Sequence, residues 1–209
     1  ASLSGLIHVS TNDATIEGNT FGTETTVCSG WDGASADYTQ PLGFFVLDVS
    51  GNTWADQDIA SHTDGIVVVD DVVYVNHAVA LQQAVNDAEL SGKTITLTKN
   101  LALASPLEIS QDVKIDGANH TLTCAADGIA IKADLDSLSI ANLTISGEPL
   151  AEGEKVVEGI GTNMGLGTYG AYWGVADLDL YNVTIENFNY GIYFGKDPAN
   201  SLPVDQLNN

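Results

Sequence analysis

Apolar residues recur with helical spacing in one segment of the chain. Between His77 and Leu90 they fall close to the 3.6-residue period of an α-helix, at Val79, Leu81, Ala84, Val85, Ala88 and Leu90. Asn76 is placed to cap the N-terminus of this helix, and Gly92 is placed to end it. The pattern therefore predicts an amphipathic helix over residues 77–90 and no other helix in the chain.

After this helix, short segments alternate apolar and polar residues with the period of two that is typical of strands. These segments are residues 94–97, 107–109, 113–115, 121–123, 129–131, 138–140, 143–145 and 183–185. A doubly wound sheet would need a crossover helix of about a dozen residues between parallel strands, and none is available after Gly92. The remaining folds are an antiparallel sandwich and a solenoid of short parallel strands.

Internal repetition favours the solenoid. Residues 140–147, IANLTISG, recur as LYNVTIEN at residues 180–187, with a looser copy at residues 113–117. The same theme appears near the N-terminus, where ATIEGNTF at residues 14–21 resembles LDVSGNTW at residues 47–54. Each copy contains Gly or Asn to turn the corner, since both tolerate the left-handed backbone conformation needed there. Such repetition is what stacked coils produce, so we predict an all-β parallel β-helix over residues 93–195.

The run from the helix into the first strands resembles the start of the pectate-lyase-like superfamily of right-handed parallel β-helices, of the cell-surface kind. The matching segments are residues 81–88, 93–97 and 113–122. The resemblance implies that the β-helix is right-handed and that the amphipathic helix caps its first coil. A cap is physically required, because the open end of a solenoid exposes apolar core and unpaired strand edges. The resemblance is specific to the fold and says little about function.

We therefore predict three parts: a β-rich segment at residues 1–60, a β-hairpin and capping helix at residues 61–92, and the β-helix at residues 93–209. The hairpin is expected within residues 66–75, IVVVDDVVYV. Residues 1–54 also have the pattern of coils, yet they precede the cap. Either they form a separate small β unit, or they dock on the C-terminal end of the β-helix in the same chain or a neighbour. Docking on a neighbour is a head-to-tail contact, which builds filaments when it does not close.

The charge of the chain excludes several partners. It carries 28 Asp and Glu against 6 Lys and no Arg, for a formal net charge of −22. A phosphate-binding surface needs clustered Lys and Arg, so nucleic acid and anionic membranes are not expected partners. No apolar run reaches the ~18 residues of a membrane span, so direct membrane insertion is not expected either. Such an acidic surface could bind cations or neutral glycans, or could serve only to keep the protein in solution. We expect an extracellular or cell-surface location.

The missing arginine also bears on catalysis. Polysaccharide lyases with this fold use a basic residue, commonly arginine, and the related hydrolases combine paired aspartates with Gly-His-Gly and Arg-x-Lys motifs. This chain has Asp70 and Asp71 only, in the predicted hairpin, and neither of the other motifs. Its four histidines have no ligand-like spacing. We predict that the protein is not an enzyme.

Acidic pairs are the candidate metal ligands. Asp134 with Asp136, and Asp177 with Asp179, each place two carboxylates on one face of a strand. Such pairs repel unless a cation or water screens them, so they predict either a calcium site or a solvated acidic face.

Cys28 and Cys124 have no metal-binding spacing. They could form one long-range disulfide, pair between subunits or remain buried thiols, and an extracellular setting favours the disulfide.

Two further sets of residues are candidate ligand or modification sites. Tyr169, Tyr172 and Trp173 could stack on sugar rings if exposed, or form an aromatic ladder in the core if buried. Sequons at Asn119, Asn142 and Asn182 allow N-glycosylation if the host performs it.

The sequence as a whole predicts a non-catalytic extracellular structural protein. Its copies would join through solenoid ends or edges into a homo-oligomer or polymer such as a layer, sheath or filament. An adhesin or glycan-binding module is the main alternative, and a polysaccharide lyase or glycoside hydrolase is the third.

Overall fold

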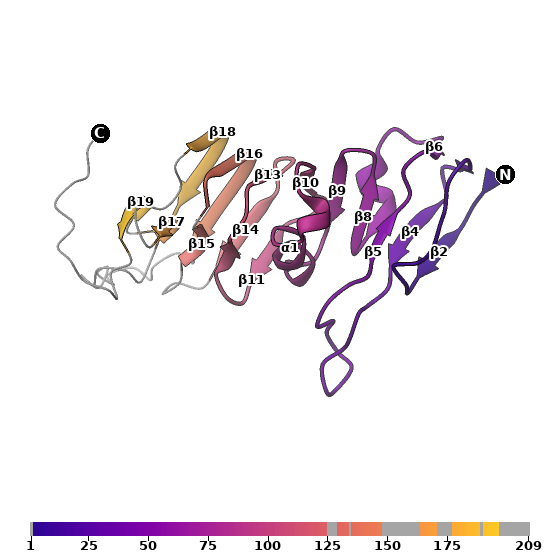
Figure 1. The fold of residues 1–209 in the computed structure, drawn as a ribbon, viewed down its shortest axis with the longest axis horizontal. Helices are drawn as coiled ribbons and strands as arrows, with labels where there is room; N and C mark the ends of the chain where they lie inside the picture. Colours follow the sequence, from indigo (N-terminus) through magenta and orange to yellow (C-terminus); the bar gives the residue numbers. More distant parts are fainter. Residues whose placement is uncertain are drawn as a thin grey trace. The chain divides into compact units, whose positions relative to one another are not determined.

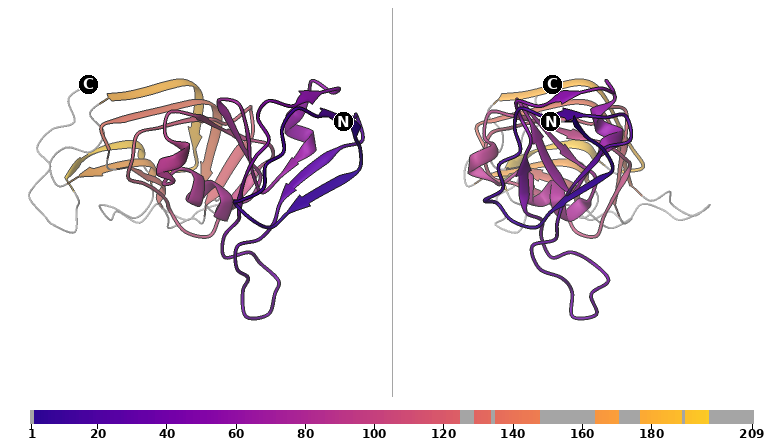
Figure 2. Two further views of the ribbon diagram at one scale, coloured as in Figure 1. Left: turned by 45° about the vertical axis from the view of Figure 1, so that its right-hand side comes forward. Right: turned by 90° about the vertical axis from the view of Figure 1, so that its right-hand side faces the viewer.

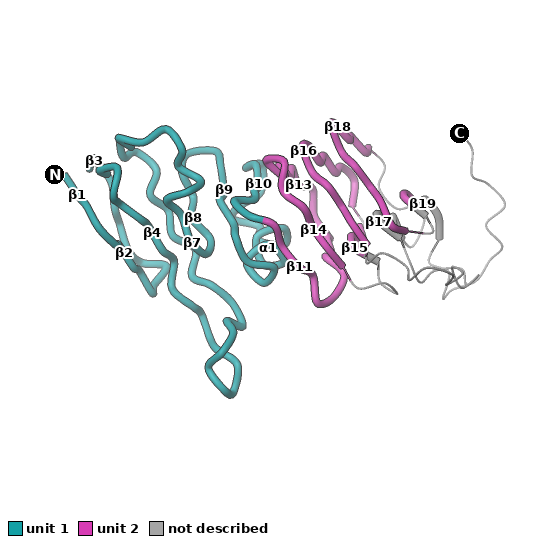
Figure 3. Tube along the Cα trace, turned by 180° about the vertical axis from the view of Figure 1, so that it is seen from behind, with its two compact units in different colours: residues 1–99 teal, residues 100–209 magenta. Residues whose placement is uncertain are grey.

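The structure is a computed structural model that describes residues 2–124, 129–133, 135–147, 164–170, 177–188 and 190–196. Its contacts divide the chain into two compact units, Ala1–Lys99 and Asn100–Asn209 (Figure 3). The described part is mostly β-strand, with parallel pairing predominating and with one α-helix (Figure 1). Apart from one hairpin in the first unit, the described strands pair with strands that are distant in the sequence.

Two small parallel sheets form the N-terminal part of the first unit. One contains β1 (Ser2–Leu3), β3 (Thr20–Phe21) and β6 (Thr53–Trp54), in that order. The other contains β2 (Leu6–Val9), β4 (Thr26–Ser29) and β7 (Thr63–Asp64). A single 3₁₀ turn, Ile59–His62, leads into β7.

The two N-terminal sequence repeats stack on each other in register, as their similarity suggests. Thr20 pairs with Thr53 and Phe21 with Trp54. The preceding glycines, Gly18 and Gly51, both have positive φ, and the Gly18 amide donates to the Gly51 carbonyl at 3.2 Å. The rings of Phe21 and Trp54 then meet edge to face in the core, with centroids 4.6 Å apart.

A third set of strands in this unit contains the hairpin predicted from the sequence. β5 (Val46–Asp48) pairs in parallel with β8 (Ile66–Val69), and β8 pairs antiparallel with β9 (Val72–Val75) across a turn at Asp70. β9 then pairs in parallel with β10 (Thr94–Leu97). The strand direction therefore reverses once within this unit, between β8 and β9.

The helix is shorter than the sequence predicts. The α-helix α1 spans Ala78–Ala84, and a separate 3₁₀ turn covers Ala88–Leu90. The Asp87 side chain accepts a hydrogen bond from the Glu89 amide, which caps the 3₁₀ turn and interrupts the helical pattern. The chain turns at Gly92, whose φ is +83°, as expected.

The predicted N-cap is also wrong. His77 occupies the N-cap position and makes no side-chain cap, while the Asn76 side chain is turned to Gly65 and Asp64. The apolar face of α1 is nevertheless buried through Ala80, Leu81 and Ala84.

Residues 1–54 pack on their own chain in the first unit. Leu47 and Val49 from this segment share a buried cluster with Val67 and Val69 of β8. The side chain of Gln83 in α1 adds a two-way link, because its Oε1 accepts from the Phe44 amide at 2.9 Å and its Nε2 donates to the Phe44 carbonyl at 2.8 Å. The amide of Gln83 thus pairs with the backbone as a neighbouring strand would.

The second unit contains two groups of parallel strands. One comprises β11 (Leu101–Leu103), β13 (Val113–Asp116), β14 (Thr121–Cys124), β16 (Ser137–Gly147) and β18 (Asp177–Glu186). The other comprises β12 (Leu107–Ile109), β15 (Ile129–Ala133), β17 (Met164–Gly170) and β19 (Tyr190–Lys196). All the strands predicted after Gly92 are present, with residues 138–140 and 143–145 joined in the single strand β16.

The sequence repeats of this unit also lie in register. Leu143 pairs with Val183, and Ile145 with Ile185. The corner directly before these pairs is made by asparagines with positive φ, Asn142 at 51° and Asn182 at 52°. Asn182 Nδ2 donates to Asn142 Oδ1 at 3.0 Å, and Asn142 Nδ2 donates to Asp116 Oδ1 at 3.1 Å. A ladder of side-chain hydrogen bonds therefore connects three successive strands at this corner.

Substitution of Asn142 tests the ladder and the left-handed corner separately. Asn142→Ala loses two side-chain hydrogen bonds, at about 1 kcal/mol each. It also keeps a Cβ atom in the left-handed backbone conformation, which costs about 1–2 kcal/mol. Asn142→Gly loses the same hydrogen bonds without that steric cost. We expect the free energy of unfolding in urea to fall in both, and further in the alanine variant. An alanine variant as stable as the glycine variant would contradict the corner argument.

Candidate functional site

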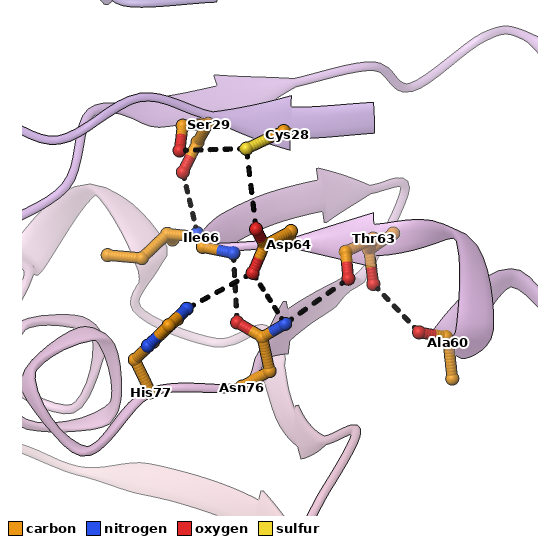
Figure 4. A network of polar contacts seen from close by, with 9 residues as sticks. Cys28, Ser29, Ala60, Thr63, Asp64, Ile66, Asn76 and His77 are labelled. Carbon is orange, nitrogen blue, oxygen red and sulfur yellow. Dashed lines mark hydrogen bonds and ion pairs between the residues drawn. The ribbon is translucent and has the colours of Figure 1, made fainter. Parts of the chain in front are cut away.

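A network of polar side chains in the first unit is centred on Asp64 (Figure 4). β4 and β7 pair so that Cys28 lies opposite Asp64. Asn76 and His77 approach from the link between β9 and α1. The hairpin reversal places these two residues beside β7, although they lie more than ten positions from Asp64 in the sequence.

Asp64 contacts all three of its neighbours. Its Oδ1 accepts from Asn76 Nδ2 at 2.7 Å and lies 3.1 Å from His77 Nε2. Its Oδ2 accepts a hydrogen bond from the Cys28 thiol at 3.5 Å. Asn76 Oδ1 accepts in turn from the Gly65 amide, and the His77 ring packs on Phe44 with centroids 4.9 Å apart.

These contacts shift two pKa values in opposite directions. The hydrogen bond from His77, followed by that from Asn76, holds the pKa of Asp64 well below its ordinary range, against the opposing effect of burial. Burial raises the pKa of Cys28 to about 11, and the charge and hydrogen bond of Asp64 add to that rise. The carboxylate is therefore ionised and the thiol protonated at neutral pH.

The geometry does not match a nucleophilic triad. In such a triad the imidazole lies between the nucleophile and the carboxylate, whereas here the carboxylate lies between the thiol and the imidazole. A thiol with a raised pKa is also a poor nucleophile and a poor metal ligand. The cluster instead ties β4, β7 and the start of α1 together. No sequence signal marked it, because its members come from three separate segments.

The predicted calcium ligands lie partly outside the described residues. Asp134 is not described, while Asp136, Asp177 and Asp179 are exposed. Across the β16–β18 pair, Asp177 and Asp179 face Ser137 and Ser139 rather than other carboxylates. Among the residues that the structure describes, no three His, Cys, Asp or Glu side chains are grouped to hold a metal. The calcium site stays a prediction.

The cysteines lie in different units. Cys28 is a half-buried thiol bonded to Asp64, and Cys124 is buried at the end of β14. Their pairing stays a prediction.

The sequons occupy corners of the second unit. Asn119 is exposed, with φ of 66°. At Asn142 and Asn182 the side-chain nitrogen to which a glycan would attach donates the ladder hydrogen bonds. Glycosylation was predicted for all three and stays a prediction.

The aromatic residues chosen from the sequence cannot be placed as a binding surface. Tyr172 and Trp173 lie outside the described residues, and for Tyr169 only the backbone, in β17, is described. Exposed aromatic residues occur at Tyr181 on β18 and in a loop that the sequence did not single out. Trp31 and Tyr38 lie there, with side chains 43% and 81% exposed, together with Leu42 at 68%.

Comparisons of the chain with family models, with curated proteins and with solved structures found no match. Within the described ranges, no helix is long and apolar enough to cross a membrane. Functional inference therefore depends on the geometry of the chain itself.

The reactivity of Cys28 tests the Asp64 contact. Asp64→Asn removes the negative charge that helps to raise the thiol pKa and leaves at most a neutral amide as the hydrogen-bond partner, while burial remains, so alkylation by iodoacetamide at pH 8.5 should become several-fold faster. Rates are measured in a Cys124→Ala background, which leaves one thiol. Asp56→Asn, which alters a comparable Asp–His contact with His62, is the matched control and should leave the rate unchanged. An unchanged rate in Asp64→Asn would refute the contact.

The lowered pKa of Asp64 also predicts an acid-dependent contribution to stability. Its folded pKa lies below its unfolded value of about 4, so the contribution is complete above that pH and is lost as the pH falls through the folded pKa. The difference in free energy of unfolding between wild type and Asp64→Asn should therefore shrink as the pH is lowered below about 4. Urea titrations at pH 2 to 7 measure it, and a difference that does not change with pH would contradict the assignment.

Proposed function

We propose that this chain is a non-catalytic extracellular structural protein that self-assembles through strand edges, and that its fold is a right-handed parallel β-helix of the pectate-lyase-like kind. Parallel strands whose repeated sequences pair in register support the solenoid, as do the left-handed corners that recur at equivalent positions. The antiparallel pairing of β8 with β9 is the one departure from parallel pairing between the named strands of the described residues.

The observation that carries the proposal is the edge formed by β1 and β2. Each is the terminal strand of its sheet in the described structure. Residues 2–12 contain no proline, no lysine and no carboxylate, which are the residues that usually protect an edge from pairing with another chain. Leu6 on this edge is 71% exposed. An unprotected edge of this kind favours addition of a strand from a neighbour.

The backbone of β2 has groups directed toward that open side. The Gly5 and Val9 carbonyls accept hydrogen bonds from the Thr26 and Gly30 amides, so these residues are bonded on the β4 side. Because backbone direction alternates along a parallel strand, Leu6 and His8 direct their N–H and C=O groups away from β4. These are the groups that a neighbouring chain would bond.

Two features support a non-catalytic role. The Asp64 cluster has a protonated thiol and an interposed carboxylate, which is unsuited to nucleophilic catalysis. The chain also has no arginine for the chemistry of fold-related lyases. The extracellular location rests on the strongly acidic composition of the sequence.

Removal of one outward backbone donor tests edge assembly. His8→Pro deletes an N–H directed to the open side while the bonds of Gly5 and Val9 to the β4 side remain. Loss of one or two intermolecular hydrogen bonds, each worth about 1 kcal/mol, should weaken association about tenfold. Sedimentation velocity over a concentration series measures the mass, and negative-stain electron microscopy reports the form of the assemblies.

His8→Ala is the matched control, because it changes the side chain and keeps the N–H. It should associate like the wild type. A wild-type chain that remains monomeric at every concentration, or a proline variant that associates as strongly as the alanine variant, would overturn the edge proposal.

A further inference from the structure

A loop projects from the first unit between β4 and β5 and contains the dipeptide Asp32–Gly33 (Figure 2, purple loop). An isolated antiparallel bridge between Trp31 and Phe44 joins the two sides of the loop at its base. Asp32 and Gly33 follow directly after this bridge, and both residues are exposed. The Asp-Gly bond is therefore open to water in the folded chain.

An Asp-Gly bond is especially prone to spontaneous rearrangement. The glycine nitrogen attacks the side-chain carboxyl carbon of the aspartate, and a five-membered succinimide ring forms with loss of one water. Because glycine has no Cβ, its nitrogen approaches the carboxyl carbon without the steric hindrance that other residues impose. Water then opens the ring at either carbonyl and gives aspartate or isoaspartate. The reaction needs no other reactant and leaves the mass of the chain unchanged.

The chain provides its own comparison, because the same dipeptide occurs in several surroundings. Asp-Gly dipeptides lie at residues 32–33, 64–65, 116–117 and 127–128. The last of these lies outside the described residues. The other three have the same reacting groups, so their folded surroundings decide how readily each one reacts.

Hydrogen bonds hold the glycine amide at two of these places. The Gly65 amide donates to Asn76 Oδ1 at 3.0 Å, and the Gly117 amide donates to the Ala141 carbonyl at 2.8 Å. Both glycines are buried. An amide that is bonded in this way cannot turn onto the preceding carboxyl group until the bond breaks, so these two dipeptides react only after local opening of the fold.

Gly33 is not held in this way. Within the described part of the chain, its amide donates to no acceptor, although the amides of Asp32 and Ser35 both donate across the loop. Ring closure at Asp32–Gly33 therefore breaks no hydrogen bond of the Gly33 amide.

The space around the three glycines differs in the same direction. A Cβ built on Gly65 would lie 2.9 Å from the Ser29 carbonyl oxygen, and one built on Gly117 would lie 2.7 Å from Leu143 Cα. Around a Cβ built on Gly33 the nearest atom is 3.5 Å away. The backbone shift that accompanies ring closure has room at Gly33 and is opposed by neighbouring backbone at the other two glycines.

We propose that Asp32–Gly33 is a site of spontaneous isoaspartate formation in the folded protein. The Gly33 nitrogen bonds to the side-chain carboxyl carbon of Asp32, and the amide proton leaves with the carboxyl hydroxyl as water. A second water then adds to the main-chain carbonyl carbon of the ring and breaks its bond to nitrogen. Gly33 is now linked through the former side chain, the backbone is longer by one methylene, and the negative charge is kept. This modification does not depend on self-assembly of the chain.

The added methylene falls inside the pairing of the loop. On one side of the modified link the Asp32 amide donates to the Gly43 carbonyl at 2.9 Å, and on the other side the Gly33 carbonyl accepts from the Leu42 amide at 3.1 Å. A longer backbone between these two bonds cannot keep both in their present register. Isoaspartate formation is therefore expected to detach the outer part of the loop, and Trp31, which directly precedes Asp32 and is 43% exposed, should report the change.

Ageing of the full-length chain tests the proposal. The folded protein is kept for several weeks at neutral pH and physiological temperature and is then digested with pepsin at low pH. Mass spectrometry with electron-transfer fragmentation quantifies isoaspartate at each site. We expect it to accumulate at least tenfold faster at residues 32–33 than at residues 64–65 and 116–117, a ratio that corresponds to about 1.4 kcal/mol of local opening at the held sites. Equal rates at the three sites, or no isoaspartate at residues 32–33, would overturn the proposal.

The unfolded chain is the matched control for local sequence. In guanidinium chloride the three dipeptides lose their different surroundings, and their rates should agree within a few-fold. An excess at residues 32–33 that is as large in the unfolded chain as in the folded chain would overturn the structural assignment, because the neighbouring sequence alone would then explain it.

The variant Asp32→Glu tests the effect on the loop. It keeps the negative charge but would have to close a six-membered ring, which forms much more slowly. Tryptophan fluorescence of the wild type should drift as isoaspartate accumulates, whereas that of Asp32→Glu should stay constant over the same period. An equal drift in both proteins, or a constant emission from a wild type that has become modified, would overturn the predicted detachment of the loop.

Discussion

The structure depends on the in-register stacking of left-handed corners. A chain that runs straight along a strand and then bends needs a residue that tolerates positive φ, and Gly18, Gly51, Asn142 and Asn182 supply it at equivalent points of successive repeats. Once the corners are stacked, the strands on either side have no freedom of register, because a shift of one residue would turn every buried side chain outward. The Asn142–Asn182 hydrogen bond adds a direct link between corners. Each repeat is therefore aligned by the one before it.

The hairpin between β8 and β9 adds a second constraint in the first unit. It reverses strand direction, so residues 1–69 and the strands after Asp71 cannot continue one another by simple repetition. Side chains join the two directions instead. Gln83 pairs with the Phe44 backbone, and Asp64 bonds Asn76 and His77 beside Cys28. The bonds of Gln83 to Phe44 and of Asp64 to Asn76 and His77 join segments that are not paired with each other as strands. Side chains therefore supply hydrogen bonds there that a backbone ladder supplies elsewhere.

Local periodicity predicted the strands well, because alternation and corner residues are properties of adjacent positions. The strands after Gly92, the hairpin at Asp70 and the stacking of the GNTF and GNTW repeats all follow from such patterns. The helix was predicted too long because apolar spacing continues past Ala84, whereas α1 ends there and the Asp87 side chain caps a separate 3₁₀ turn at Ala88–Leu90. The Asp64 cluster was missed, since it depends on contacts between segments that are distant in the sequence.

The distribution of charge bears on the proposed assembly. A net charge of −22 repels copies of the chain over most orientations, and that repulsion is strongest where carboxylates would face one another. Residues 2–12 carry no carboxylate, and they include β1 and β2, the terminal strands of their sheets in the described structure. An acidic surface with one uncharged edge disfavours random aggregation and leaves that edge available, so repulsion elsewhere would add to the specificity of the proposed contact. In the proposed assembly, the acidic residues would thus select the orientation in which copies of the chain meet.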